Sequence, residues 1–189
     1  MALGVPGAVN PVLDATGEHC GRRQVDKVWF LAGSFGPGSV QRTCAVPAGK
    51  SLFFPLINTS YAAFLNDAPD TRTEQFIRAA GSCTDPAQIS VSINGTKVRT
   101  PTQYFTGRSG SQSPFFNVQL PPANLFGLDE TVIPELVLSP SAEQGYYLFV
   151  NPLPPGRHEI KWLASGCTPG NSQDITYHLN VVGKGGRDD

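Results

Sequence analysis

The four cysteines are the residues whose chemistry the sequence specifies best. They are Cys20, Cys44, Cys83 and Cys167. No two of them form a C-x-x-C pair, which disfavours zinc ribbons and thioredoxin-type redox motifs. An even number of widely spaced cysteines is typical of structural disulfides in an exported protein. Of the three pairings that four cysteines allow, we predict Cys20–Cys44, which ties an irregular N-terminal segment to a strand, and Cys83–Cys167.

Histidines and short acidic loops are the residues that could bind a metal. His158 and His178 fall on opposite faces of two strands that we expect to pair, so they cannot share an ion, and we assign both structural roles. The loop at 66–70 could offer oxygen ligands to calcium, but it is no EF-hand, and helix capping accounts for Asp70. We therefore predict no organic cofactor and no metal site, with calcium as the ion left open.

Carboxylates in loops could act as the acid and base of a glycoside hydrolase or lyase. No G-x-S-x-G nucleophile motif is present, and Gly107 to Ser111 only approximates one. The spacing of the carboxylates in the sequence does not indicate that any two of them act together. Those outside the regular strands are Asp14, Asp67, Asp70, Glu74, Asp129, Glu130, Glu135 and Glu143. The sequence therefore leaves open whether the protein is an enzyme.

Aromatic side chains offer a surface on which a flat ligand could stack. Tyr146 and Tyr147 are adjacent in an expected strand, so one faces inward and the other outward. The long polar loop at 106–114 is flanked by aromatic residues, and its one charged side chain could hydrogen-bond hydroxyl or carboxylate oxygens. The alternative is that these aromatics only anchor the core and the loop. The predicted binding residues are Tyr104, Arg108, Phe116, Tyr146 and Tyr147.

The elements that must position these side chains are mostly strands. Apolar and polar residues alternate most clearly at 156–164 and 174–182, as in strands with one buried face. Thr71 and Glu74 fit a capping box at the start of a helix. About nine or ten strands and one short helix near residues 71–80 predict an all-β fold, an antiparallel β-sandwich with a jelly-roll-like topology.

Length and composition indicate a single globular domain of 189 residues with a net charge of −1. We expect an irregular segment at 1–26, the β-sandwich at 27–182 and a flexible tail at 183–189. The near-zero charge argues against a nucleic-acid partner. No apolar stretch reaches the roughly 18 residues that a membrane-spanning helix needs, so we expect no membrane span.

Three segments carry a resemblance to a known family. They are VWFLAG at 28–33, RTCAVPAGKSLFFPLIN at 42–58 and LPPGRHEI at 153–160. Together they resemble a family of exported, uncharacterised bacterial proteins that share a CxVPAGKxLFFPxIN core. The resemblance covers most of residues 10–182, and it implies secretion and a compact β fold. It supplies no catalytic residues.

We therefore expect a secreted protein whose signal peptide has been trimmed, so that none is present in this chain. Its expected function is recognition of a small molecule or glycan at the surface, with carbohydrate as the favoured ligand class. One alternative is a small secreted enzyme, either a hydrolase or lyase using loop carboxylates or a cyclase or isomerase with a cavity. A second is an assembly or toxin-like component that acts on another cell. The alternative to export is a cytosolic protein with four free thiols.

Overall fold

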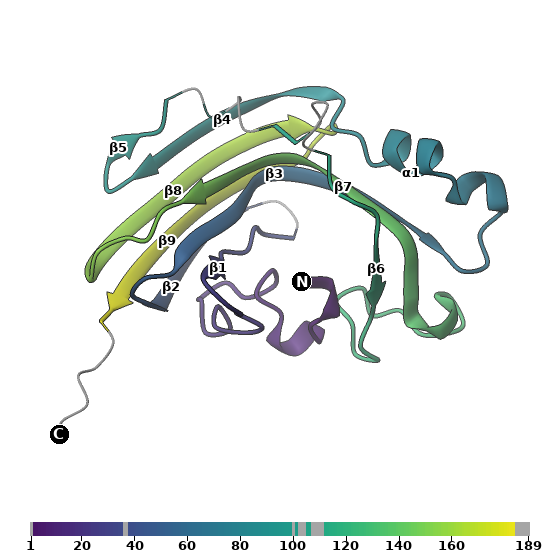
Figure 1. Cartoon of the computed structure of the whole chain (residues 1–189), viewed down its shortest axis with the longest axis horizontal. Helices are drawn as coiled ribbons and strands as arrows, with labels where there is room; N and C mark the ends of the chain where they lie inside the picture. Colours follow the sequence, from purple (N-terminus) through teal and green to yellow (C-terminus); the bar gives the residue numbers. More distant parts are fainter. Residues whose placement is uncertain (1, 36–37, 100, 102–104, 107–111, 184–189) are drawn as a thin grey trace.

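The computed structural model describes residues 2–35, 38–99, 101, 105–106 and 112–183. Two β-sheets pack face to face as a sandwich, and the chain adds a single short α-helix at one end, which confirms the predicted all-β class. Figure 1 shows the strands of both sheets arching over the N-terminal segment.

Each sheet joins strands that are distant in the sequence. The first, called sheet A, contains in spatial order β1 (Val28–Phe30), β3 (Ser51–Phe64), β7 (Val137–Val150) and β6 (Phe116–Gln119). The second, called sheet B, contains in spatial order β2 (Ser39–Pro47), β9 (Ser172–Val182), β8 (Gly156–Cys167), β4 (Asp85–Ile93) and β5 (Thr96–Lys97).

Two edge pairings differ from the antiparallel pattern that we predicted. β1 runs parallel to β3, and β2 runs parallel to β9, whereas the other strand pairs in the described residues are antiparallel. The chain crosses between the sheets from β1 to β2 and again from β2 to β3. Alternation of polar and apolar residues identifies the buried face of a strand but not the direction of its neighbour.

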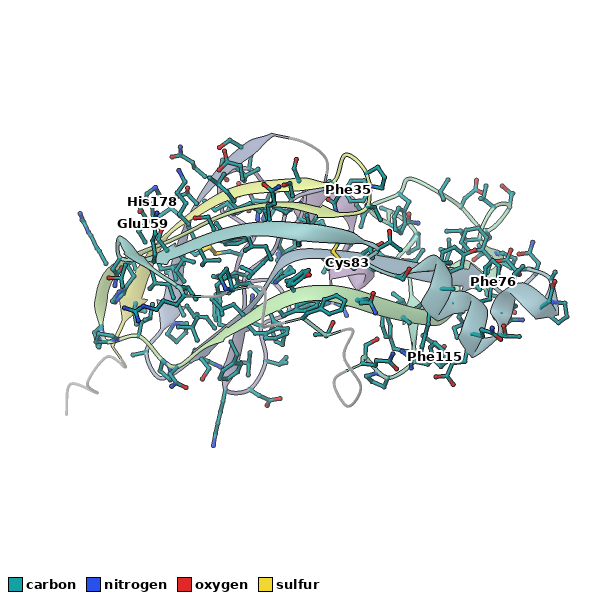
Figure 2. The ribbon with its side chains drawn as sticks, turned by 90° about the horizontal axis from the view of Figure 1, so that it is seen from above. Phe35, Phe76, Cys83, Phe115, Glu159 and His178 are labelled. Carbon is teal, nitrogen blue, oxygen red and sulfur yellow. A yellow bond between two sulfur atoms is a disulfide. The ribbon has the colours of Figure 1, made fainter. Side chains whose placement is uncertain are left out.

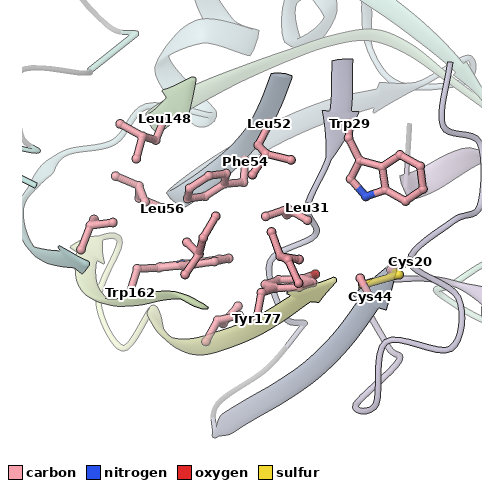
Figure 3. Close-up of a cluster of buried hydrophobic side chains, with 14 of the residues drawn as sticks. Cys20, Trp29, Leu31, Cys44, Leu52, Phe54, Leu56, Leu148, Trp162 and Tyr177 are labelled. Carbon is pink, nitrogen blue, oxygen red and sulfur yellow. A yellow bond between two sulfur atoms is a disulfide. The ribbon is translucent and has the colours of Figure 1, made fainter. Parts of the chain in front are cut away.

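The core lies between the two sheets and is centred on stacked rings. The indole of Trp162 is fully buried between Phe54 and Tyr177, with ring centroids 5.0 Å and 5.9 Å away (Figure 3). Trp29, on β1, is 8% exposed and belongs to the same cluster. Large rings of this kind bury much apolar area each, so they contribute strongly to the stability of the sandwich.

The helix begins two residues later than the predicted capping box. A 3-10 turn, η3 (Pro69–Arg72), precedes the helix α1 (Glu74–Ala80), whose N-cap is Thr73. The Thr73 hydroxyl accepts a hydrogen bond from the backbone N–H of Phe76 at 3.3 Å. The prediction of Thr71 as the cap is wrong, because the Thr71 hydroxyl instead donates to the carbonyl of Ala68 within the turn.

Other 3-10 turns of the described residues also lie outside the sheets, among them η1 (Ala2–Gly4), η2 (Gly7–Val9) and η5 (Pro134–Leu136). Residues 2–26 otherwise consist of turns and bends, apart from an isolated bridge between Val25 and Val28. Both predicted disulfides are present in the structure, Cys20–Cys44 and Cys83–Cys167. The first links the N-terminal segment to β2, and the second links the segment after α1 to the end of β8.

A buried arginine holds the N-terminal segment against the two sheets. Arg42, on β2, is 1% exposed. Its guanidinium donates to the Asp14 carbonyl at 2.6 Å, to the Ala32 carbonyl at 2.7 Å and to the Tyr177 hydroxyl at 2.8 Å. Further acceptors are the carbonyls of Gly33 and Val12. Among the described residues, Arg42 forms no ion pair with a carboxylate, so neutral oxygens alone satisfy its charge.

We predict that Arg42→Met lowers the free energy of unfolding by about 3–5 kcal/mol, because several buried acceptors lose their donor at once. Arg42→Lys is expected to lose most of the same free energy, since a single ammonium cannot reach the acceptors that the planar fork spans. Denaturant unfolding measures both effects, with Arg157→Lys at an exposed position of β8 as the control. Wild-type stability in Arg42→Met would contradict the assignment.

The Asp14 carboxylate organises the same N-terminal segment. It accepts backbone N–H groups from His19 and Thr16 at 2.8 Å and from Gly17 at 3.0 Å. Burial raises the pKa of Asp14, but these backbone hydrogen bonds outweigh it and lower the pKa to about 2. The ionised carboxylate is therefore favoured in the folded protein.

Because the pKa of Asp14 is depressed on folding, its contribution to stability is complete above pH 4 or so and is lost as the pH falls toward 2. We predict that Asp14→Asn lowers the free energy of unfolding at neutral pH by about 1 kcal/mol, after allowance for solvent screening. The difference from the wild type should shrink between pH 4 and pH 2. Denaturant unfolding across this range measures it, and Glu18→Gln, in the same loop and exposed, should show no such trend.

Candidate functional site

The structure separates the predicted binding residues. Tyr104 and Arg108 lie outside the described residues. Tyr146 and Tyr147 point to opposite faces of β7, as predicted; Tyr146 packs toward the core and contacts the ring of Phe105 at a centroid distance of 4.9 Å. Phe116 pairs with a residue six positions before Tyr147 on β7, which is roughly 20 Å away in an extended strand. Tyr147 lies on the outer face of sheet A, where its ring stacks on that of Phe53.

Aromatic rings extend across the outer face of sheet A from β1 over β3 to β7. Phe30 and Phe149 are the register partners of Phe53 on its two sides, so all three side chains share this face. The rings of Phe30 and Phe53 meet edge to face at 5.9 Å, and those of Phe53 and Tyr147 are parallel at 5.5 Å. Phe149 is 56% exposed. We call Phe30, Phe53, Tyr147 and Phe149 the aromatic face.

Sequence reasoning missed three members of the aromatic face. Phe30 and Phe53 lie inside continuous apolar runs, in which no polar residue marks the outward-facing positions. In the structure the neighbours of Phe53, Leu52 and Phe54, are buried, so Phe53 itself must point outward. The signal was present in the strict alternation of a strand, but a continuous apolar run conceals it.

A polar group adjoins the aromatic face. The Tyr147 hydroxyl donates to Oε1 of Glu143, and Asn58 Nδ2 donates to the same oxygen at 2.6 Å. Glu143 and Tyr147 lie on β7 and Asn58 lies on β3. The two strands pair at this point, with Asn58 opposite Gly145. The face therefore combines rings with one carboxylate that is held by two neutral donors.

Gly145 makes the contact between Tyr147 and Glu143 possible. The two residues are four positions apart, roughly 13 Å along a strand, so their side chains must lie along it and meet above Gly145. A Cβ atom at Gly145 would come within 2.5 Å of the Asn58 Cα atom and of the Ile57 carbonyl. The close approach of β3 and β7 at this position therefore requires glycine.

The environment of Tyr147 keeps its hydroxyl protonated. Burial raises the pKa of Tyr147 strongly, and the negative charge of Glu143 and the hydrogen bond to it raise the pKa further. A lyase that uses tyrosine as its base needs the opposite shift. Tyr147 is thus suited to donate a hydrogen bond and not to remove a proton at neutral pH.

Four of the other candidate carboxylates make local contacts. Asp67 accepts the backbone N–H of Phe64 at 2.8 Å, and Asp70 accepts that of Thr71 at 3.1 Å. Glu74 forms an ion pair with Arg78 at 2.9 Å, and Asp129 accepts a hydrogen bond from the Thr131 hydroxyl. In the described part of the chain, no hydrogen bond or ion pair brings a second carboxylate to Glu143, as a hydrolase with paired carboxylates would require.

The histidines point to opposite faces of sheet B, as predicted. His178 lies 3.8 Å from Glu159 on the outer face, at the end of the sandwich away from α1 (Figure 2). His158 contacts the side chain of Asn94 at 3.0 Å and the Pro154 carbonyl at 2.8 Å. Among the residues that the structure describes, no three His, Cys, Asp or Glu side chains gather into a possible metal site.

Sheet B has a hollow on its outer face. It is a shallow depression of about 660 Å³ whose floor includes the exposed side chain of Leu163. The rest of its lining is largely polar: Ser39, Gln88, Ser90, Ser165, Ser172, Gln173 and Asp174. A further hollow beside α1 holds only about 20 Å³. Neither has the deep apolar shape that a cavity-type cyclase or isomerase needs.

Comparison with models of protein families and with curated proteins finds no match for this chain. The resemblance to exported bacterial proteins therefore stays a prediction. In the described part of the chain, no helix has the length and apolar character needed to cross a membrane. The functional assignment thus depends on the geometry of the site.

We predict that Gly145→Ala lowers the free energy of unfolding by about 1–3 kcal/mol, because the added methyl group forces β3 and β7 apart. Gly183→Ala is the matched control, since a Cβ atom there meets nothing within 4 Å. Denaturant unfolding gives the stability of each variant. If both variants are as stable as the wild type, the close strand approach at Gly145 is not required.

Proposed function

We propose that the protein is a secreted β-sandwich module that binds carbohydrate through the aromatic face of sheet A. The observation that carries the proposal is the row formed by the exposed Phe149, Phe53 and Tyr147, at whose end Tyr147 contacts the carboxylate of Glu143. A pyranose ring has apolar C–H groups on its faces and hydroxyl groups around its rim. Aromatic rings with polar groups at one end complement both parts.

The position of the face on the scaffold also supports binding. Its rings come from β1, β3 and β7, so three paired strands fix their spacing. The residues next to these rings along each strand are buried in the core, which prevents the strands from rotating: Trp29, Leu52, Phe54 and Leu148. A surface held in this way loses little side-chain entropy when a ligand binds.

Enzymatic alternatives find less support in the same residues. The pKa of Tyr147 is raised by burial and by Glu143, which disfavours a role as base. Glu143 has the hydrogen-bond partners of a fixed acceptor and not the second carboxylate of a hydrolase. The depression on sheet B offers hydroxyl and amide groups but no aromatic ring on which a sugar could stack.

Secretion is the second part of the proposal. Both disulfides of the structure are of the kind that oxidising compartments maintain. The resemblance to exported bacterial proteins points the same way. The ligand would then be a glycan outside the cell that makes the protein.

We predict that Phe149→Ala weakens oligosaccharide binding about three- to tenfold with little change in stability, because an exposed ring is lost from the face. The measurement is isothermal titration calorimetry with the saccharide that binds best on a glycan array. Leu163→Ala removes a similarly exposed apolar side chain from the outer face of sheet B and should leave binding unchanged. Absence of binding to every array saccharide by the folded wild type would refute the proposed function.

A further inference from the structure

Among the described residues, the carboxylate of Glu143 has no cationic partner, although it lies in a partly buried position. The ion pairs among the described residues join Arg78 to Glu74 and His178 to Glu159. The donors to Glu143 are the Tyr147 hydroxyl and the Asn58 amide, both neutral and both directed at Oε1. Among the hydrogen bonds of the described residues, none reaches Oε2 of Glu143.

We propose that the aromatic face selects oligosaccharides of amino sugars with a free amino group, and that Glu143 pairs with their ammonium group. This inference rests on the proposed function, and it names the class of sugar. A charge removed from water without a counter-ion is unfavourable. A ligand ammonium would supply the missing charge and an N–H donor for the free oxygen Oε2.

The rings beside Glu143 favour the same charge. The face of an aromatic ring carries a negative potential that attracts a cation within about 6 Å of the centroid. The Tyr147 ring is stacked on Phe53, and its hydroxyl donates a hydrogen bond to Glu143, so the rings and the carboxylate form one continuous surface. A cationic substituent placed there is attracted by both.

The length of the surface indicates an oligosaccharide. Phe149 and Glu143 are six positions apart on β7, roughly 20 Å along the strand. One sugar ring cannot contact both, whereas a chain of several rings can stack on Phe149 and carry an amino group to Glu143. N-acetylation would remove the positive charge, and a uronic acid would place a second negative charge beside Glu143.

The test compares three hexasaccharides with the same β-1,4 linkage, made of glucosamine, N-acetylglucosamine or glucose. Calorimetry at a mildly acidic pH, where the amine is protonated, measures each dissociation constant. We expect the glucosamine hexamer to bind the wild type about tenfold more tightly than the other two. Glu143→Gln keeps an oxygen that accepts from Tyr147 and Asn58, and it should abolish this preference.

Glu159→Gln makes the same chemical change on the outer face of sheet B and should keep the preference, which controls for general attraction of a cationic ligand. Equal binding of all three saccharides, or an undiminished preference in Glu143→Gln, overturns this inference and leaves the proposed function intact. Binding of none of them also overturns this inference, and the glycan array then decides separately whether the proposed function stands. Should Glu143→Gln fail to fold, Glu143→Asp withdraws the carboxylate by one methylene and must reduce the preference.

Discussion

The burial of the Arg42 guanidinium is the constraint on which the arrangement of this fold depends. A planar cation with five donors, taken out of water, must find several acceptors at fixed angles. Here those acceptors come from the N-terminal segment, the residues after β1 and the hydroxyl of Tyr177 on β9. No one of these segments could satisfy the charge alone, so the cation keeps all of them together. The neighbouring disulfide Cys20–Cys44 joins two of the same segments covalently.

That constraint reaches the aromatic face through β1. The three-residue strand β1 pairs with β3 along one side. Ala32 lies two positions after the last residue of β1, and its carbonyl accepts hydrogen bonds from the Arg42 guanidinium and the Tyr177 hydroxyl. With β1 held at this register, Phe30 stands opposite Phe53 while Trp29 enters the core. The same short strand therefore contributes to stability through one side chain and to the outer surface through the next.

Much of the fold could be predicted from local patterns, and the candidate site could not. Alternation identified the strands at 156–164 and 174–182 and placed Tyr146 and Tyr147 on opposite faces, because these depend on neighbours in sequence. The parallel edges and the contact of Asn58 with Glu143 depend on which strands meet and in which register. A bulge after Pro55 changes that register within β3. A proline inside a strand indicates a bulge or an edge, but it does not indicate which residues of the neighbouring strand then lie opposite.

At the polar end of the aromatic face, both donors to Glu143 are held in their protonated forms. In a general acid–base pair, the two groups exchange a proton during each cycle, which requires pKa values near the working pH. Tyr147 lies far from that condition, because burial and the Glu143 charge both favour its protonated form. Asn58 cannot titrate, so both donors to Glu143 hold their protons and keep its oxygen in one position. Oε1 of Glu143 is therefore held by two donors that keep one hydrogen-bonding pattern, and residues fixed in this way lose little freedom when a ligand binds.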